Sequence, residues 1–395
     1  MHLGTQLVVH IMNQDDFHKL ISGQKSGPGI VLLRLLLDIA AIGYSIAVRL
    51  RNFLYSKGWL KAHRADAVVI SIGNITVGGT GKTPLVVWLC KQIISDSRFQ
   101  ISNSQCAILT RGYKSRAQEH KSTRAQELKS TRAQEIGSLK DEPAILIEKC
   151  PEVKVIVNPD RVGGAGEAIN KFGAKVLIMD DGFQHRRLER DLDIVAIDAT
   201  RPFGYGKMLP AGLLREPVSS LKRADGVVIT RCDQITENEI SQIEKKLRAI
   251  NPDMVIARSI HAPAYVKSTD NKEISLKYLK GKKIFAFCGI GNPDAFLNTI
   301  KQLGANLVGS KVYNDHHHYT NDCLADIYEQ AGALKADLIL TTQKDWTKII
   351  SDFRIQISDF EYSLPLAYIG IEIKFLAGED KLRGLIEKTL AGKIP

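Results

Sequence analysis

The sequence lacks the cysteine spacing of a secreted or zinc-binding protein. Its six cysteines lie far apart, and no Cys-x-x-Cys pair occurs. Such spacing argues against a disulfide framework and against a zinc ribbon. Residues 1–28 are polar and mixed, without the charged start, apolar core and cleavage site of a signal peptide. We therefore expect a protein of the reducing cytoplasm, with a loosely held N-terminal extension.

A long uncharged apolar run is also missing. The most apolar segment, residues 29–50, is interrupted by Arg34 and Asp38, and its longest uncharged stretch, Ile39 to Val48, is too short to cross a bilayer. On a helix the polar residues of this segment share one side and leave a wide apolar face. A helix of that shape can lie along a membrane interface. The same pattern also fits a buried helix of a soluble core.

Acidic residues are outnumbered, with 43 Asp and Glu against 54 Lys and Arg and a net charge of +11. This balance suits nucleic acid, an anionic membrane surface or a phosphorylated substrate, and charge alone does not choose among them. The stretch from Arg49 to Arg64 carries five Lys or Arg residues and no acid, mixed with Phe53, Tyr55 and Trp59. Basic and aromatic residues together are typical of an interface with anionic headgroups.

The chain is long enough for two hydrophobic cores, because it has 395 residues with 44% hydrophobic content. Short apolar strands alternate with helical stretches, which predicts an α/β fold with a mostly parallel sheet covered by helices. We expect a polar extension (1–28), an amphipathic helix and basic linker (29–64), a nucleotide-binding domain (65–270) and a second, smaller α/β domain (271–395). Three near copies of one polar sequence fill residues 114–137, and we interpret them as an insertion in a surface loop.

A glycine-rich loop follows the apolar run at residues 68–72. Its sequence is Thr76-Val77-Gly78-Gly79-Thr80-Gly81-Lys82-Thr83. Strand, glycine loop and Gly-Lys-Thr in this order are the phosphate-binding arrangement of P-loop proteins, although Thr76 stands where the pattern has its first glycine. Backbone N–H groups of such a loop hold phosphates, Lys82 reaches the outer phosphates, and the Thr83 hydroxyl is placed for Mg²⁺. The sequence therefore predicts ATP and Mg²⁺ as cofactors.

Carboxylates at two places are candidates for the metal and for proton transfer. Asp180 and Asp181 follow a predicted buried strand, where P-loop enzymes keep an acid for Mg²⁺. Asp141 and Glu142 form a second pair directly after the insertion. A polar strand exit explains the first pair without a function, and a solvated surface explains the second.

A run of histidines at residues 316–318 follows Asp315. Consecutive residues do not share a helix face, and no further cysteine or histidine pattern completes a metal site. A general base with an orienting aspartate is the more attractive interpretation, because histidine titrates near neutral pH. A plain surface loop explains the run equally well.

These residues together resemble one family, the tetraacyldisaccharide 4′-kinases of Gram-negative bacteria. The resemblance runs from about Leu33 to the C-terminus, and its distinctive pieces are Ser71 to Pro84, Thr110 to Tyr113, Asp141 to Pro143, Asp180 to His185, Leu209 to Gly212, Leu214 to Pro217 and Asp315 to His317. It implies a P-loop kinase with an N-terminal membrane-associated helix. It also implies transfer of the ATP γ-phosphate to the 4′-hydroxyl of a lipid-linked glucosamine disaccharide 1-phosphate.

The resemblance also implies a catalytic pair in which Asp141 acts with His316, or with its neighbour His317, to deprotonate the acceptor hydroxyl. The repeat insertion adjoins Asp141 and leaves the path of that loop open.

We expect Lys82 and Thr76 to Thr83 to bind ATP, and Mg²⁺ to be held by Thr83 with an acid among the metal candidates Glu142, Asp180 and Asp181. We expect Arg161, Gln184 and His185 to bind substrate. The expected partners are the lipid disaccharide and an anionic membrane surface, with no nucleic acid, and we expect a monomer at the cytoplasmic face of the inner membrane. The alternative is a membrane-associated P-loop switch or partition ATPase.

Overall fold

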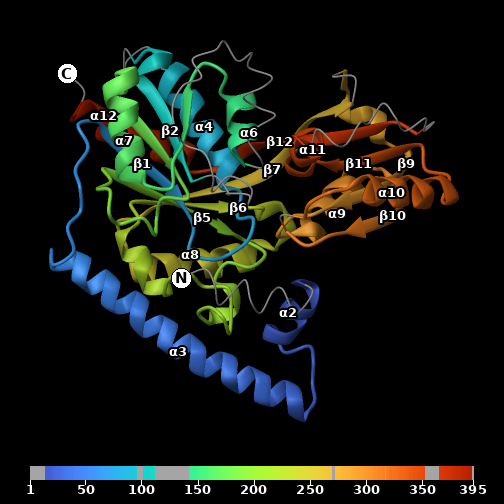
Figure 1. Cartoon of the computed structure of the whole chain (residues 1–395), viewed down its shortest axis with the longest axis horizontal. Coiled ribbons are helices and arrows are strands. Elements are labelled where there is room, and N and C mark those ends of the chain that lie inside the picture. The colour runs from blue at the N-terminus through green and yellow to red at the C-terminus, as the bar shows by residue number, and fades with distance from the viewer. Residues whose placement is uncertain are drawn as a thin grey trace, which may run out of the picture. The chain divides into compact units, whose positions relative to one another are not determined.

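The computed structural model describes residues 14–95, 101–111, 142–268, 272–315, 317–351 and 364–393 (Figure 1). The chain divides into two compact units. Unit 1 comprises residues 1–107, 161–261 and 373–395, and unit 2 comprises residues 108–160 and 262–372. The segments of the two units therefore alternate along the chain, whereas composition suggests consecutive domains. The consecutive boundaries remain a prediction.

Unit 1 is built on a parallel sheet with the strand order β7-β6-β5-β1-β4. Every residue of β1, β4, β5 and β6 is buried, as expected for strands with helices on both faces of a parallel sheet. The expected apolar strands are confirmed in place and type. Their bounds are β1 (Val68–Gly73), β4 (Val176–Asp180), β5 (Leu192–Asp198), β6 (Gly226–Thr230) and β7 (Val255–Ser268).

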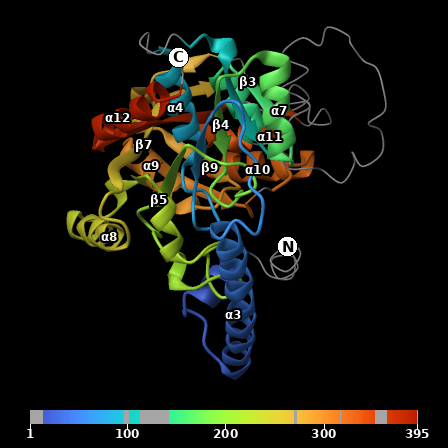
Figure 2. The same cartoon turned by 90° about the vertical axis from the view of Figure 1, so that its left-hand side faces the viewer.

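Helices α4, α7, α8 and α12 of unit 1 lie around this sheet, whereas the long α3 lies at the outside of the unit, away from the strands (Figures 1 and 2). The helix α4 starts directly after the glycine-rich loop and contacts β1 and β4. Most of its apolar residues are buried, and Leu85 and Leu89 are 0% exposed. The bounds are α2 (Gln14–Ile21), α3 (Pro28–Ser56), α4 (Lys82–Ser95), α7 (Arg161–Phe172), α8 (Glu237–Ile250) and α12 (Glu379–Ala391).

Part of the N-terminal extension is a helix, which its polar composition did not predict. Phe17 and Leu20 of α2 are buried, and Leu20 joins the core cluster that contains Leu37 and Ala41 of α3. The Arg34 guanidinium Nε donates a hydrogen bond to the Leu20 carbonyl at 2.8 Å. The burial of Phe17 and Leu20 and the hydrogen bond from Arg34 thus hold α2 against α3.

The helix α3 exposes its apolar side. The exposed large residues are Val31, Leu32, Leu35, Leu36, Ile39, Ile42, Ile46 and Leu50, each more than half exposed. Of its most apolar stretch of 18 residues only 11% is buried, and by length and composition the helix could cross a membrane. The alternative of a buried core helix is therefore not what the structure shows.

Unit 2 carries a second parallel arrangement of strands in the order β10-β9-β11-β12. Two hydrophobic clusters cover its faces, one around Phe287, Tyr319 and Trp346 and the other around Ile284 and Phe296. Its strands are β2 (Cys106–Thr110, at its border), β3 (Lys154–Val157), β8 (Glu273–Ile274), β9 (Lys283–Cys288), β10 (Asn306–Val312), β11 (Leu338–Thr342) and β12 (Leu366–Ala377). Its helices are α6 (Glu142–Lys149), α9 (Pro293–Gln302), α10 (Asn321–Ala333) and α11 (Gln343–Ser351).

Truncating the core side of α4 tests whether this helix is held by packing. Leu89 is 0% exposed. We expect Leu89→Ala to lower the free energy of unfolding by about 2–5 kcal/mol, because the side chain leaves a cavity. Urea unfolding followed by tryptophan fluorescence measures the change. Leu334→Ala removes the same atoms from a side chain that is 46% exposed, and we expect less than about 1 kcal/mol there. Equal losses for both variants would contradict the packing described here.

Candidate active site

The glycine-rich loop lies between the end of β1 and the first turn of α4. Lys82 begins α4 and is 9% exposed, and Thr83 follows it. The Asn74 side-chain amide donates to the Thr80 hydroxyl at 3.0 Å, and the Thr230 hydroxyl donates to the Thr80 carbonyl at 2.9 Å. Both contacts fix Thr80 from outside the loop. The loop is therefore held before any phosphate binds, with the N-terminal end of α4 available for an anion.

Gly81 has a backbone conformation and a neighbour that only glycine tolerates. Its φ is +85°, and a Cβ placed there would lie 2.1 Å from Nε2 of His261. That nitrogen is buried and has no hydrogen-bond partner within the described part of the chain. Burial lowers the pKa of His261 well below its usual value, and Arg231 adds to the effect, so the imidazole is neutral near pH 7. A neutral ring therefore closes off the side of the loop at Gly81.

Asp181 lies between two cations beside the loop. Its carboxylate is 3.2 Å from Nζ of Lys82 and 2.8 Å from Nη1 of Arg215. Burial raises the pKa of Asp181, but Lys82 and Arg215 outweigh it and hold that pKa well below its usual range. Asp181 is thus ionised at every physiological pH. Its φ of +53° is uncommon for a residue other than glycine and marks a constrained position at the end of β4.

The structure places the two expected acids differently. Asp180 ends β4 and is 1% exposed, and its carbonyl accepts a hydrogen bond of 3.1 Å from the Arg161 guanidinium. Arg161 is itself buried at the start of α7. Binding of a substrate phosphate by Arg161 remains a prediction, because the hydrogen bond to the Asp180 carbonyl is a contact with the backbone of β4.

Gln184 and Asn74 join the segment after β4 to the segment before the loop. The Gln184 side-chain amide donates to the Asn74 carbonyl at 2.7 Å. The side-chain oxygens of Gln184 and Asn74 are both buried and accept no hydrogen bond from a described residue. A buried acceptor without a donor costs free energy, so these two oxygens are strained points of the loop's support. His185 follows Gln184, and its expected substrate role remains a prediction.

One short segment, residues 213–216, connects α3 to the glycine-rich loop. The Val77 amide donates to the Leu213 carbonyl and the Arg215 amide donates to the Ile75 carbonyl, each at 2.8 Å. From the other side, the Tyr44 hydroxyl of α3 donates to the Arg215 carbonyl at 3.0 Å. Arg215 therefore contacts Asp181 through its side chain and Tyr44 of α3 through its backbone carbonyl.

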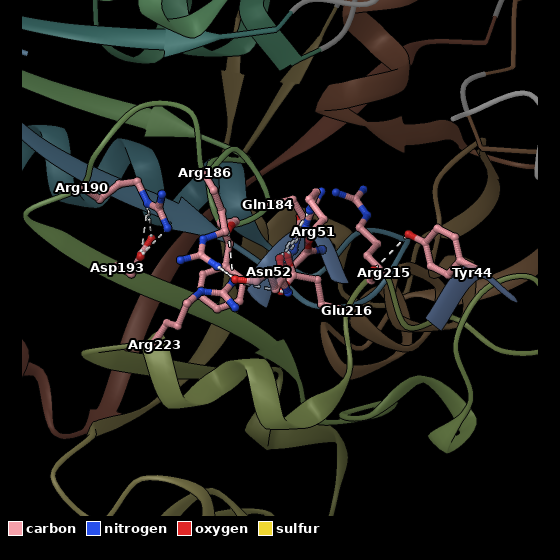
Figure 3. Close-up of polar contacts among 12 residues, drawn as sticks. Tyr44, Arg51, Asn52, Gln184, Arg186, Arg190, Asp193, Arg215, Glu216 and Arg223 are labelled. Carbon is pink, nitrogen blue, oxygen red and sulfur yellow. Dashed lines mark hydrogen bonds and ion pairs between the residues drawn. The ribbon is translucent and has the colours of Figure 1, made fainter. Parts of the chain in front are cut away.

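Glu216 accepts hydrogen bonds from polar side chains at and near the C-terminal part of α3 (Figure 3). This carboxylate is 0% exposed and accepts from Arg51 at 3.0 Å, from Asn52 at 3.1 Å and from Arg223 at 2.9 Å. Next to it, Arg186 donates to the Asn52 carbonyl at 2.8 Å. We call Arg51, Arg186 and Arg223 the arginine cluster.

The candidate proton-transfer residues belong to unit 2. Asp141 and His316 lie outside the described residues, as does the side chain of Glu142, whose backbone begins α6. His317 is described, and it is packed. Its ring stacks on Tyr313 with centroids 4.2 Å apart, and its Nε2 lies 3.5 Å from the Cys323 sulfur.

The packing of His317 also shifts its titration. Burial lowers the pKa of His317, and Lys348 lowers it further, whereas Asp345 raises it. Asp315 makes an ion pair with Lys344 at 3.2 Å. Both described neighbours of His316 are thus engaged with unit 2 itself.

Several residues of the site could not be identified from the sequence. Arg215 and Glu216 lie in the quoted motif Leu214 to Pro217, but nothing in the spacing shows which side chains they meet. Tyr44 and Asn52 are polar residues on an apolar helix, a signal that could have marked them as contacts. No sequence motif marks His261, because it meets Gly81 only where β7 passes the loop.

Comparison with known proteins shows the family of the chain. A model of the family described as tetraacyldisaccharide-1-P 4′-kinase matches residues 33–391. The tetraacyldisaccharide 4′-kinase of Halothermothrix orenii is 34% identical over 383 residues, which cover 93% of this chain and 97% of that protein. The protein of the same name from Syntrophus aciditrophicus is 35% identical over 347 residues, which cover 86% of this chain and 89% of that protein.

A solved structure is similar as well. It is a crystal structure described as the "apo" form of LpxK from Aquifex aeolicus in complex with ATP, with a TM-score of 0.62 and 27% identity. The match covers 91% of this chain and 99% of the chain in the crystal structure.

Substitution of Gly81 tests the loop geometry. We expect Gly81→Ala to weaken ATP binding by about 5- to 150-fold, because strain of about 1–3 kcal/mol from the left-handed backbone adds to the clash with His261. Adding His261→Ala should relieve the clash and recover part of the affinity, but not the strain. Titration with a fluorescent ATP analogue measures both. Gly166→Ala is the control, because a Cβ there meets nothing within 4 Å. Parent-like affinity of Gly81→Ala would contradict the loop described.

Proposed function

The chain belongs to the tetraacyldisaccharide-1-P 4′-kinase family, and from that premise we propose how its residues carry out the reaction. It is an ATP-dependent kinase that transfers the γ-phosphate to the 4′-hydroxyl of a tetraacyl glucosamine disaccharide 1-phosphate in lipid A biosynthesis. The observation that carries the mechanism is Lys82, held at the start of α4 by an ionised Asp181. A cation fixed beside a glycine-rich loop stabilises the charge on a transferring phosphoryl group.

The loop and Lys82 bind the phosphates and place them for transfer. Phosphoryl transfer needs positioning and charge neutralisation more than covalent chemistry from the protein. Thr80 is fixed by Asn74 and Thr230, so the loop loses little freedom when ATP binds. The Gln184 amide adds a contact to the Asn74 carbonyl and so supports the segment that leads into the loop.

Mg²⁺ fits the oxygen donors beside the loop. Thr83 offers a hydroxyl and Asp181 a carboxylate that stays ionised, with Asp180 adjacent. The described residues hold no group of three or more His, Cys, Asp or Glu that could hold a metal ion. Mg²⁺ is typically held by one or two protein carboxylates together with phosphates and waters. When bound, Mg²⁺ neutralises charge on the phosphate oxygens. Thr83 and one of the two aspartates would hold it, and Glu142 remains a weaker candidate.

We assign the acceptor proton to Asp141 with His316 and not with His317. His317 is packed between Tyr313 and Tyr319, and its Nε2 faces the Cys323 sulfur. Burial and Lys348 disfavour its charged form, which a base must adopt when it takes a proton. His317 is therefore suited to fixing the loop, which leaves His316 for the chemistry.

We further propose that α3 docks the enzyme on a membrane without crossing it. Its outer side is apolar and exposed, whereas its inner side is tied to residues 207–216 from Asp38 to Asn52, a span of about 21 Å at the rise of a helix. Asp38 adds an ion pair of 2.7 Å with Lys207. A helix attached along its length cannot leave its unit to span a bilayer, so the apolar side lies in the interface.

The membrane face that fits is the cytoplasmic one. All six cysteines are free, and five of them are buried. Free thiols are typical of a reducing compartment. ATP, the phosphate donor, is also found there. A peripheral or monotopic enzyme at the cytoplasmic face of the inner membrane is consistent with both.

Activity of point variants tests these roles. We expect Lys82→Ala to lower transfer of labelled γ-phosphate to tetraacyl disaccharide 1-phosphate by about 10²- to 10⁴-fold, because a charge at the reacting phosphate is lost. His316→Ala and Asp141→Ala should each lower kcat by about 10²- to 10⁴-fold with little change in ATP affinity. The measurement is lipid labelling in mixed micelles, with tryptophan fluorescence confirming that each variant is folded.

His317→Asn is the matched control for the base. It keeps a polar group of similar size, and we expect loss of stability to exceed loss of kcat. A fall in kcat equal to that of His316→Ala in a stable protein would contradict the assignment of His316. Unchanged turnover of Lys82→Ala would overturn the whole mechanism.

Charge placed on the outer side of α3 tests membrane docking. We expect Ile39→Glu to lower partitioning of the full chain into phospholipid vesicles by about tenfold or more, because a carboxylate would enter the apolar layer. Ile39 is 59% exposed. Vesicle flotation measures the bound fraction. Leu334→Glu makes the same change at a side chain of unit 2 that is 46% exposed, and it should leave partitioning unchanged. Equal binding of both variants would show that α3 does not dock.

A further inference from the structure

The arginine cluster carries more positive charge than the protein neutralises. Arg51 and Arg223 share the single carboxylate of Glu216. Among the described residues Arg186 makes no ion pair with an acid. It donates a hydrogen bond to the Asn52 carbonyl and lies over the Tyr55 ring, 5.2 Å from its centroid. Three guanidinium groups less one carboxylate leave an excess of two positive charges. That excess equals the charge of a phosphate monoester, which is about −1.5 to −2 near neutral pH.

The charges around Arg186 are mutually unfavourable without a ligand. Burial lowers the pKa of Arg186, and the nearby Arg223, Arg190 and Arg51 lower it further, whereas Glu216 raises it. Arg190 has its own partner, Asp193, at 3.0 Å. Like charges held together in a folded protein cost free energy, and an anion that enters the group removes that cost.

The cluster is preorganised by its surroundings, as the close-up shows (Figure 3). Arg223 lies over the Phe183 ring, 4.5 Å from the centroid, and makes an ion pair of 2.9 Å with Glu216. Arg51 is anchored by the same carboxylate and remains 38% exposed. Guanidinium groups fixed in this way lose little entropy on binding and present paired N–H donors that match phosphate oxygens.

The position of the cluster indicates where the phosphate comes from. Arg51 and Tyr55 belong to the C-terminal part of α3, next to the exposed aromatics Phe53 and Trp59. Aromatic side chains of this kind settle at the level of lipid headgroups. Gln184, two residues before Arg186, reaches the Asn74 carbonyl just before the glycine-rich loop. The cluster is thus built where a headgroup would meet unit 1.

We propose that the arginine cluster binds a phosphate monoester or diester carried on a lipid at the membrane surface, with Arg186 as its central donor. Two lipids offer this chemistry, the 1-phosphate of the acceptor disaccharide and the headgroup of an anionic phospholipid. The first source rests on the proposed function, and the second does not.

The first experiment compares two acceptors in mixed micelles, the tetraacyl disaccharide with its 1-phosphate and the same lipid without it. The parent should show a KM about 10- to 100-fold lower for the phosphorylated acceptor, the size expected of charged hydrogen bonds. Arg186→Gln should lose most of that difference, and Arg186→Lys should recover part of it. Arg187→Gln removes the same charge from the exposed next residue and measures the non-specific electrostatic part.

The second experiment measures flotation with neutral vesicles and with vesicles that contain anionic phospholipid. Loss of the preference for anionic vesicles in Arg186→Gln, beyond the loss in Arg187→Gln, assigns the site to phospholipid. Loss of acceptor discrimination assigns it to the 1-phosphate. A variant that retains both preferences overturns the proposal and leaves the cluster a purely structural contact of α3.

The experiments distinguish a failure of the proposed kinase function from a failure of the proposed phosphate site. If the parent labels neither acceptor, the kinase assignment fails, and the vesicle experiment still decides the cluster. Thermal unfolding and ATP affinity of Arg186→Gln must match the parent, because the glycine-rich loop is untouched. Should that variant fold poorly, Arg51→Gln repeats both experiments from the more exposed side of the cluster, with the same outcomes deciding.

Discussion

The ionised carboxylate of Asp181 is the interaction on which the rest of the site depends. It lies between Lys82, the cation of the glycine-rich loop, and Arg215. Without it, two positive charges would face each other beside the phosphates. Because the backbone of Arg215 also accepts the Tyr44 hydroxyl and donates to Ile75, this one carboxylate lies within a chain of contacts from α3 to the loop. In the reaction that we propose, the acceptor arrives with the membrane and ATP arrives from solution, and this chain of contacts joins the two sides.

The same proposal explains the unusual amphipathicity of α3. A helix of a soluble core buries its apolar side, but α3 turns that side outward and ties its polar residues to unit 1. Arg34, Asp38 and Asn52 each find a partner on the protein, so few polar groups remain to be carried into the interface. The N-terminal helix α2 closes the free end of α3 through Leu20. In the membrane docking that we propose, the apolar side of α3 belongs to unit 1 and is not an appended anchor.

Much of this was predictable from sequence, for identifiable reasons. The strands of unit 1 are continuous apolar runs, which leave no alternative to a buried parallel sheet, and the glycine-rich loop has a local signature that requires no partner. Tertiary contacts were not predictable in the same way. Glu216 meets Arg51 across 165 positions, and His261 meets Gly81 only because β7 passes the loop. Polar composition also concealed α2, because Phe17 and Leu20 suffice to fix it. Asp141 and His316 were named from family resemblance, and their assignment rests on the packing of His317 and on the variants that test it.

The central claim is that ATP is consumed only in exchange for a phosphorylated lipid. Its most direct test is to count both products in one reaction, ADP by coupled assay and the lipid phosphate by ³¹P NMR, with the full chain, ATP, Mg²⁺ and tetraacyl disaccharide 1-phosphate. The account predicts one new phosphate monoester at the 4′ position for each ADP, and almost no ADP without the acceptor. Steady ADP release in the absence of acceptor, with no new lipid phosphate in its presence, would contradict it and point to a switch or partition ATPase.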